Sequence, residues 1–170
     1  MKIALIGYGK MGKAIEEVAL EKGHEIVLVI DMHNQVDLNP ENLAKAYVAI
    51  EFTGPGTAEN NIRKCIAAGI PVISGSTGWT DHLTSVQQYC DKENGSFLYA
   101  SNFSIGVNIF FELNRKLASM MKSHADYDIN IEEIHHTQKK DAPSGTAITL
   151  ADEILKEIPF KKNWVNAIST

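Results

Sequence analysis

The 170-residue sequence contains few cysteines, no long hydrophobic run and no excess of positive charge. Its two cysteines, Cys65 and Cys90, are too few for a disulfide framework and match no thiolate metal site in their spacing. The formal net charge of −5 argues against nucleic acid or an anionic membrane as a partner, since both attract clustered lysine and arginine. The apolar run at residues 3–6 is too short to span a membrane and carries no signal-peptide pattern. We therefore expect a cytoplasmic protein.

The composition is that of a folded globular protein, with 44% hydrophobic and 22% charged residues. Short apolar runs alternate with amphipathic segments through the first hundred residues. They predict strands at residues 3–6, 26–30, 47–52, 72–74 and 97–100 and helices at residues 9–22, 57–68 and 81–91. Repeated strand–helix–strand units with short links favour a Rossmann-like parallel sheet with helices on both faces. The polar segment 31–42 carries no structural signal and is expected to be a loop.

The pattern changes after residue 103. A helix is predicted at residues 105–121, a strand at residues 127–135 and a second helix at residues 146–157. We therefore divide the chain into an α/β domain, residues 1–103, and an α+β lobe, residues 104–170.

The first predicted strand leads directly into a glycine-rich turn and a helix. Gly7 permits a sharp turn, Gly9 lets the backbone approach a pyrophosphate, and Gly12 lets the helix pack on the strand. The helix N-terminus offers N–H groups and a positive dipole end to phosphates. The alternative is a tight turn without a ligand. The candidate pyrophosphate-binding residues are Gly7, Tyr8, Gly9, Lys10, Met11 and Gly12.

The second predicted strand ends at Asp31, about 24 residues after Gly7 and close to the ~20 expected for the acid that binds the adenosine ribose. The alternative is an aspartate that only caps the strand end. Met32 stands where an arginine would favour a 2′-phosphate, which indicates NADH over NADPH. Lys10, Lys13 and His33 are still candidate sources of positive charge nearby, so both cofactors stay open.

Three further loops follow predicted strands, where open parallel sheets bind their ligands. Residues 52–56 and 75–78 are rich in glycine and hydroxyl groups, and residues 100–103 follow the fifth strand. They are suited to close approach by a nicotinamide ring and its ribose, although plain turns are the alternative. The candidate cofactor contacts here are Gly75, Ser76, Thr77, Ala100, Ser101, Asn102 and Phe103.

The stretch at residues 133–147 reads Glu-Ile-His-His-Thr-Gln-Lys-Lys-Asp-Ala-Pro-Ser-Gly-Thr-Ala. A histidine can donate a proton near neutral pH, and the lysines add positive charge. The helix that starts at residues 143–146 offers N–H groups to a carboxylate. Together these features predict a pocket for a small dicarboxylate that also receives a proton; the alternative is a solvated charged loop. Adjacent histidines on a strand point to opposite faces, so we expect no metal site.

This stretch closely resembles the signature of the 4-hydroxy-tetrahydrodipicolinate reductase (dihydrodipicolinate reductase) family. The resemblance extends to the glycine turn, to Phe52 and Thr53, and to residues 75–78 and 100–108. It implies reduction of 4-hydroxy-tetrahydrodipicolinate to tetrahydrodipicolinate by NADH or NADPH, in the diaminopimelate route to lysine. Two other functions remain open: a non-catalytic nucleotide-binding sensor, and a related reductase that acts on another small dicarboxylate.

The resemblance also implies roles for individual residues. His135 would be the proton donor, with Lys139 as its catalytic partner. The substrate carboxylates would be bound by His136, Gly145 and Thr146, and the helix start adds Ser144 to this group. The family works as a cytoplasmic homotetramer, and its members continue past the equivalent of residue 170, so the second lobe is expected to be shortened here.

Overall fold

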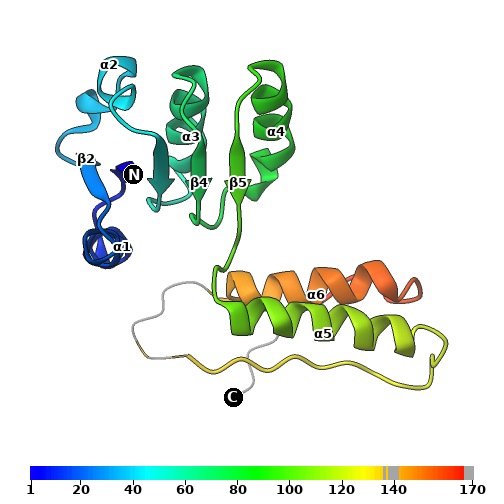
Figure 1. Ribbon diagram of the computed structural model, residues 1–170. Helices are drawn as coiled ribbons and strands as arrows, with labels where there is room; N and C mark the ends of the chain where they lie inside the picture. Colours follow the sequence, from blue (N-terminus) through cyan, green and yellow to red (C-terminus); the bar gives the residue numbers. More distant parts are fainter. Residues whose placement is uncertain (136, 138–141, 167–170) are drawn as a thin grey trace. The chain divides into compact units, whose positions relative to one another are not determined.

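The computed structural model describes residues 1–135, 137 and 142–166. The chain forms two compact units, Met1–Ser101 and Asn102–Thr170. The first unit is built on one five-stranded sheet in which all neighbouring strands are parallel. Its order is β2-β1-β3-β4-β5 (Figure 1), with β1 at Lys2–Ile6, β2 at Glu25–Ile30, β3 at Val48–Glu51, β4 at Val72–Ser74 and β5 at Phe97–Tyr99.

The strand order reverses between β1 and β3, which makes this position the topological switch point of a doubly wound sheet. The register aligns the last residues of neighbouring strands: Ile6 lies beside both Ile30 and Glu51, and Ser74 lies beside both Glu51 and Tyr99. The loops that follow the five strands therefore all start at the same edge of the sheet. The Rossmann-like fold expected from the sequence is confirmed.

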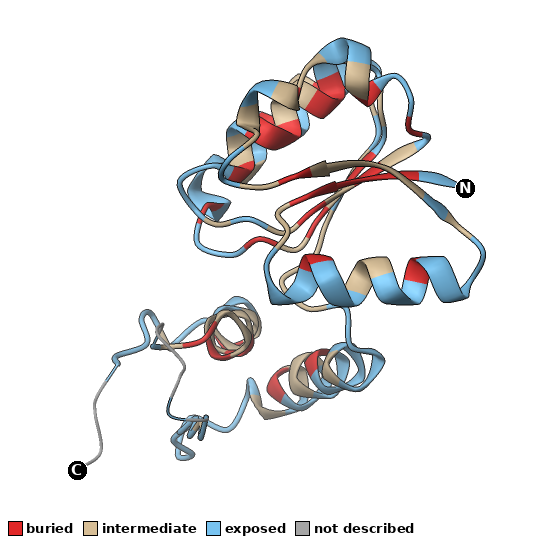
Figure 2. Ribbon diagram, turned by 90° about the vertical axis from the view of Figure 1, so that its left-hand side faces the viewer, coloured by how far each residue is buried: buried red, intermediate tan, exposed pale blue. Residues whose placement is uncertain are grey.

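Helices cover both faces of the sheet, and their buried residues face it (Figure 2). The core has two parts, one on each face of the sheet, and alternate residues of β1 belong to different parts because successive side chains of a strand point to opposite faces. Ile3 and Leu5 pack with Ala19 of α1, Lys10–Glu21, on one face. Ala4 and Ile6 belong to the larger core that includes α3, Ala58–Ala67, and α4, Leu83–Lys92.

Residues 31–42, expected to be a loop, contain two short helices, and that expectation is wrong. They are η1, Gln35–Asp37, and α2, Pro40–Leu43. The local signal is the Asn39-Pro40 pair: the Asn39 side chain accepts a hydrogen bond from the Asn42 N–H at 3.0 Å, and proline suits the first helical turn. Burial of Leu43, which is fully inaccessible, anchors the segment on the core.

The second unit contains two long helices, α5 at Ile105–Met121 and α6 at Gly145–Glu157, which match the predicted helices closely. They pack against each other, and Phe111 of α5 and Leu150 of α6 are both buried. The Asn114 side-chain amide also donates to the Leu150 carbonyl at 3.1 Å. None of the described helices combines the length and hydrophobicity that crossing a bilayer requires.

The prediction of a strand at residues 127–135 is wrong, because this segment forms no strand in the structure. The apolar alternation at Tyr127, Ile129 and Ile131 has the period of a strand, but a strand also needs a neighbour for its backbone hydrogen bonds. Within residues 102–135, 137 and 142–166 the structure places no strand that could pair with it. The segment, which connects α5 and α6 in the sequence, is therefore mostly exposed to solvent.

Candidate active site

The glycine turn after β1 requires glycine at its first position. Gly7 has φ +97°, and its N–H donates to the Ile30 carbonyl at 2.8 Å. A Cβ at this position would lie 2.0 Å from the Phe52 carbonyl oxygen. Only glycine lets β1, β2 and the loop after β3 approach so closely at the switch point.

The start of α1 is open to a ligand. A Cβ on Gly12 would lie 2.1 Å from the Gly7 carbonyl oxygen, so the helix packs directly on the turn. A Cβ on Gly9 would meet nothing within 4 Å, and no side chain caps the helix at this residue. Exposed N–H groups at an uncapped helix N-terminus form an anion site. The turn therefore fits the pyrophosphate of a dinucleotide.

The Tyr8 side chain is directed to α1. Its hydroxyl donates to the Glu16 carboxylate, and Lys13 Nζ lies 5.7 Å from the ring centroid. The hydrogen bond to Glu16 is the main cause that raises the pKa of Tyr8. Tyr8 thus contributes its backbone to the predicted phosphate turn, while its side chain braces the first turns of the helix.

Asp31 follows β2 directly and lies beside the glycine turn. Its Oδ1 accepts the His33 N–H at 2.7 Å, and its own N–H donates to Asn34 Oδ1 at 2.7 Å. The aspartate therefore caps the strand end, which was the alternative to ribose binding. A carboxylate has a second oxygen and further lone pairs, so this cap leaves capacity for two ribose hydroxyls.

Glu51 is a site residue that the sequence analysis missed. This last residue of β3 is fully buried, and its Oε1 accepts the Ser76 hydroxyl and the Thr53 N–H, each at 2.9 Å. Its Oε2 accepts the Ser74 hydroxyl at 2.5 Å. Because a buried carboxylate needs several donors, an acid at the end of an apolar strand was the signal that pointed to such a network. Glu51 fixes the loops after β3 and β4, which carry predicted cofactor contacts.

The loop after β4 is further fixed by packing. A Cβ on Gly75 would lie 2.2 Å from the Phe52 ring, so the two loops touch. Trp79 is buried, donates its indole N–H to the Ser76 carbonyl at 2.8 Å and packs edge-on against Tyr99. Thr77, between these anchors, is exposed at the sheet edge. The structure thus brings residues 7–12, 31 and 75–77 to one edge of the first unit.

The predicted contacts after β5 are divided between the two units. Ala100 remains in the first unit, where its N–H donates to the Ser74 carbonyl at 3.2 Å. Asn102 belongs to the second unit, where its Oδ1 accepts the Ser104 N–H at 2.8 Å just before α5. Ser101 and Phe103 stand on either side of Asn102 and complete the predicted set.

In the second unit, Glu133 brings together two of the predicted chemical residues. Its Oε2 lies 2.8 Å from His135 Nε2, and its Oε1 accepts the Ser144 N–H at 2.8 Å. Ser144 is buried and caps α6, since its hydroxyl oxygen accepts the Ala147 N–H at 3.1 Å. Gly145 and Thr146 follow as the first helical residues. The predicted residues His136 and Lys139 lie outside the described residues.

The electrostatics of this cluster favour a charged carboxylate. Hydrogen bonds from the Ser144 side chain, from His135 and from the Ser144 backbone lower the pKa of Glu133 from 4.5 to about 2. Glu133 is therefore ionised at neutral pH. It places a fixed negative charge between a histidine ring and the N-terminus of a helix.

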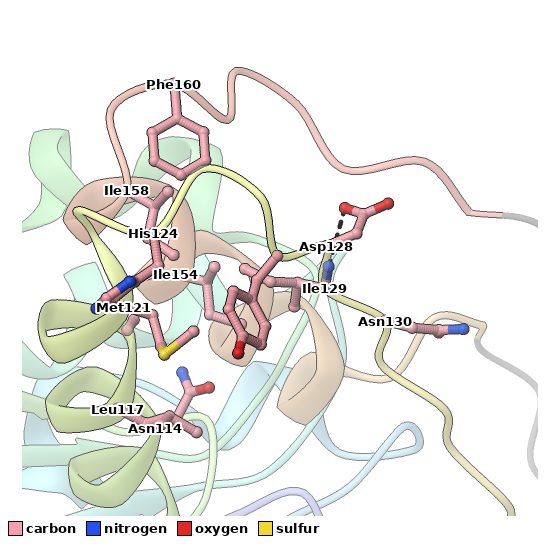
Figure 3. Close-up of a pocket in the computed structure, with 12 residues that line it drawn as sticks. Asn114, Leu117, Met121, His124, Asp128, Ile129, Asn130, Ile154, Ile158 and Phe160 are labelled. Atoms are coloured by element: carbon pink, nitrogen blue, oxygen red, sulfur yellow. Dashed lines mark hydrogen bonds between the residues drawn. The ribbon is translucent and has the colours of Figure 1, made fainter.

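A separate cavity of about 290 Å³ lies in the second unit (Figure 3). Its lining is mostly apolar and comes from α5, α6 and the segments that follow each of them, with Met121, Ile154 and Phe160 among its walls. None of the predicted site residues that the structure describes lines it. Within the described part of the chain, no three His, Cys, Asp or Glu side chains are grouped so as to hold a metal ion.

An open parallel sheet with a glycine turn and an uncapped helix at its switch point defines a Rossmann-type dinucleotide-binding protein. Comparison with family models identifies the particular family. The model described as dihydrodipicolinate reductase, N-terminus, matches residues 1–103, and the model described as dihydrodipicolinate reductase, C-terminus, matches residues 106–168. The chain belongs to the dihydrodipicolinate reductase family.

Individual relatives agree with this assignment. The chain is 50% identical over 164 residues to the 4-hydroxy-tetrahydrodipicolinate reductase of Christiangramia forsetii, covering 96% of this chain and 68% of the relative. It is 34% identical over 160 residues to the enzyme of that name from Thermosipho africanus, covering 93% and 69%. The solved structure of a dipicolinate-bound dihydrodipicolinate reductase from Paenisporosarcina sp. TG-14 matches with a TM-score of 0.70 and 27% identity, covering 100% of this chain and 71% of that chain. The chain thus spans about two thirds of the length of these relatives.

Proposed function

We propose that this chain reduces 4-hydroxy-tetrahydrodipicolinate to tetrahydrodipicolinate with a nicotinamide dinucleotide, with loss of the 4-hydroxyl group as water, a step of the diaminopimelate route to lysine. The observation that carries the proposal is the 50% identity, over 96% of the chain, to a reductase named for this substrate. That match includes both the glycine turn and the stretch 133–147, so it spans the residues proposed for cofactor and for substrate. In this assignment residues 1–103 bind the dinucleotide and residues 104–170 bind the substrate.

The cofactor is held along the edge of the sheet where the five strands end. Gly7 to Gly12 and the N-terminus of α1 receive the pyrophosphate, and Asp31 accepts the adenosine ribose hydroxyls. Residues 75–77 and 100–103 contact the nicotinamide half. The bound reduced nicotinamide supplies the hydride. We favour NADH, because the carboxylate of Asp31 repels a 2′-phosphate and the neighbouring Met32 side chain, 82% exposed, carries no positive charge to offset it.

The substrate is held and protonated by the second unit. Gly145 and Thr146, the first residues of α6, direct N–H groups toward a carboxylate, and His136 and Lys139 add polar and positive groups. The Ser144 backbone and side chain are engaged with Glu133 and Ala147, so Ser144 contributes by fixing the helix end. His135 donates the proton that balances the charge left on the ring after hydride addition, which contributes about 10²–10⁴-fold to the rate.

Two further features belong to this proposal. We place the enzyme in the cytoplasm and expect four identical chains per particle, as the family resemblance implies. Light scattering on the purified chain tests the second expectation, and a single-chain particle would contradict it.

The experiment that tests the function is an assay of NADH and NADPH oxidation with the condensation product of pyruvate and aspartate semialdehyde. We expect substrate-dependent oxidation, and we expect His135→Gln to lower kcat by about 10²-fold or more while NADH binding stays nearly unchanged. His124→Gln, in the same unit but outside the proposed site, is the matched control. NADH binding without substrate-dependent oxidation would indicate a sensor instead.

A further inference from the structure

We propose that Glu133 is a positioning residue that sets the tautomer and orientation of His135 and ties this ring to the helix end that receives the substrate carboxylate. The inference rests on the proposed function, in which His135 donates the proton. No role for Glu133 follows from that function alone, because its carboxylate is turned toward protein groups.

The local backbone explains why these two side chains meet. Residues 133–135 belong to neither a helix nor a turn. Glu133 and His135, two positions apart, lie together with Oε2 and Nε2 2.8 Å apart, while Ile134 between them is 87% exposed. The side chains of Glu133 and His135 are 27% and 39% exposed, so the pair is partly shielded from water.

The charge of Glu133 decides which ring nitrogen carries a hydrogen. An ionised carboxylate only accepts hydrogen bonds, so the Nε2 atom that faces it must be the N–H donor. The proton that leaves during the reaction is then the one on Nδ1. After this proton has moved to the substrate, the neutral ring keeps its hydrogen on Nε2, and the contact with Glu133 is unchanged. A carboxylate behind a catalytic histidine acts in this way in other enzymes.

The second oxygen of Glu133 connects the ring to the substrate cradle. Oε1 accepts the Ser144 N–H at 2.8 Å, and Ser144 in turn caps α6 through the Ala147 N–H. One side chain thus sets both the proton donor and the N–H groups of Gly145 and Thr146. Substrate orientation depends on the distance between these two groups, and such positioning contributes strongly to rate.

The first test separates turnover from cofactor binding. Glu133→Gln keeps an oxygen for the Ser144 N–H but replaces the acceptor facing Nε2 with an amide donor. We expect kcat to fall roughly 10- to 100-fold, by analogy with the loss that follows removal of the hydrogen-bond partner of a metal-binding histidine, with NADH affinity nearly unchanged. Glu132→Gln is the matched control, since this exposed neighbour takes no part in the cluster, and its kcat should stay at the wild-type value. Wild-type kcat in Glu133→Gln would overturn the inference.

A double variant tests whether Glu133 acts through His135. If it does, Glu133→Gln combined with His135→Gln is no slower than His135→Gln alone, because there is no longer a ring to position. Losses that multiply would overturn the inference. Full activity in His135→Gln alone would instead refute the role of His135 as proton donor, and absence of substrate-dependent oxidation in the wild type would refute the proposed function, so these failures are distinguishable.

The protonated nitrogen of the ring can be observed directly, without an activity measurement. Nitrogen-15 NMR of histidine-labelled wild-type protein, with His135→Gln used for assignment, should show the neutral His135 ring with its hydrogen on Nε2. In Glu133→Gln this preference should be lost. A wild-type ring with its hydrogen on Nδ1 would overturn the inference, whatever the kinetics of the variants.

Discussion

Replacing Glu51 with alanine should cost a large part of the stability of the first unit. The substitution removes the acceptor of the Ser74 hydroxyl at 2.5 Å and of the Ser76 hydroxyl and the Thr53 N–H at 2.9 Å. Ser74 is fully buried and Ser76 is 5% exposed, so water reaches neither hydroxyl easily. Thr53 is exposed, and water can replace the acceptor for its N–H.

The magnitude follows from the two buried hydroxyls. Each buried donor left without a partner costs about 1–3 kcal/mol, so the pair costs about 2–6 kcal/mol. We therefore expect Glu51→Ala to lower the free energy of unfolding by about 2–6 kcal/mol. For a domain with a total stability of about 5–15 kcal/mol, this is enough to populate the unfolded state in mild denaturant.

The assay is urea unfolding monitored by the fluorescence of Trp79, in a Trp164→Phe background. Trp79 reports on the affected loop, because its indole N–H donates to the Ser76 carbonyl. Glu59→Ala is the matched control: Glu59 pairs with Arg63 at 2.9 Å, but both side chains are about 30% exposed, and we expect a loss below about 1 kcal/mol. Equal midpoints for the two variants would refute the reasoning that the Glu51 network is structural.

Two other predictions concern the cofactor and acid pH. Asp31→Ala should weaken NADH more than NADPH, because it removes the ribose acceptor and relieves repulsion of a 2′-phosphate; an equal loss in fluorescence titrations would contradict the ribose assignment. The pKa of Glu133 is lowered from 4.5 to about 2, so its stabilisation is complete above its unfolded value and is lost as pH falls through this interval. The melting temperature of wild type should therefore be higher than that of Glu133→Gln at neutral pH, and the two should approach each other near pH 2. A difference in melting temperature that does not change with pH would contradict the lowered pKa of Glu133.

Local periodicity was sufficient for most of the fold. The strand at Val72–Ser74 and the helix at Ile105–Met121 have the predicted bounds, because a buried strand and an amphipathic helix each impose a repeat that a few adjacent residues display. The glycine turn could be predicted from the sequence for a similar reason, because the steric requirement for glycine at position 7 arises at the junction of strand and helix.

Features that depend on contacts between residues far apart in the sequence could not be predicted from local periodicity. The Glu51 network joins positions 23 and 25 residues apart, which only the parallel register of β3 and β4 brings together. The segment 127–135 has the alternation of a strand, but pairing is decided by a neighbour that its own residues do not encode. The α2 helix was missed because its four residues are too few to show a period, although its Asn39-Pro40 start was visible.

The shared register of β3 and β4 has a consequence for how this family can vary. Glu51 reaches Ser74 directly across the ladder and Ser76 two positions on, so the length of the acid is matched to one hydroxyl at the end of β4 and one in the loop after it. An aspartate at position 51 would be too short to accept hydrogen bonds from both the Ser74 and the Ser76 hydroxyl. Substitutions at positions 51, 74 and 76 should therefore occur together among related sequences, as a correlated set, while the exposed Thr77 beside them changes independently.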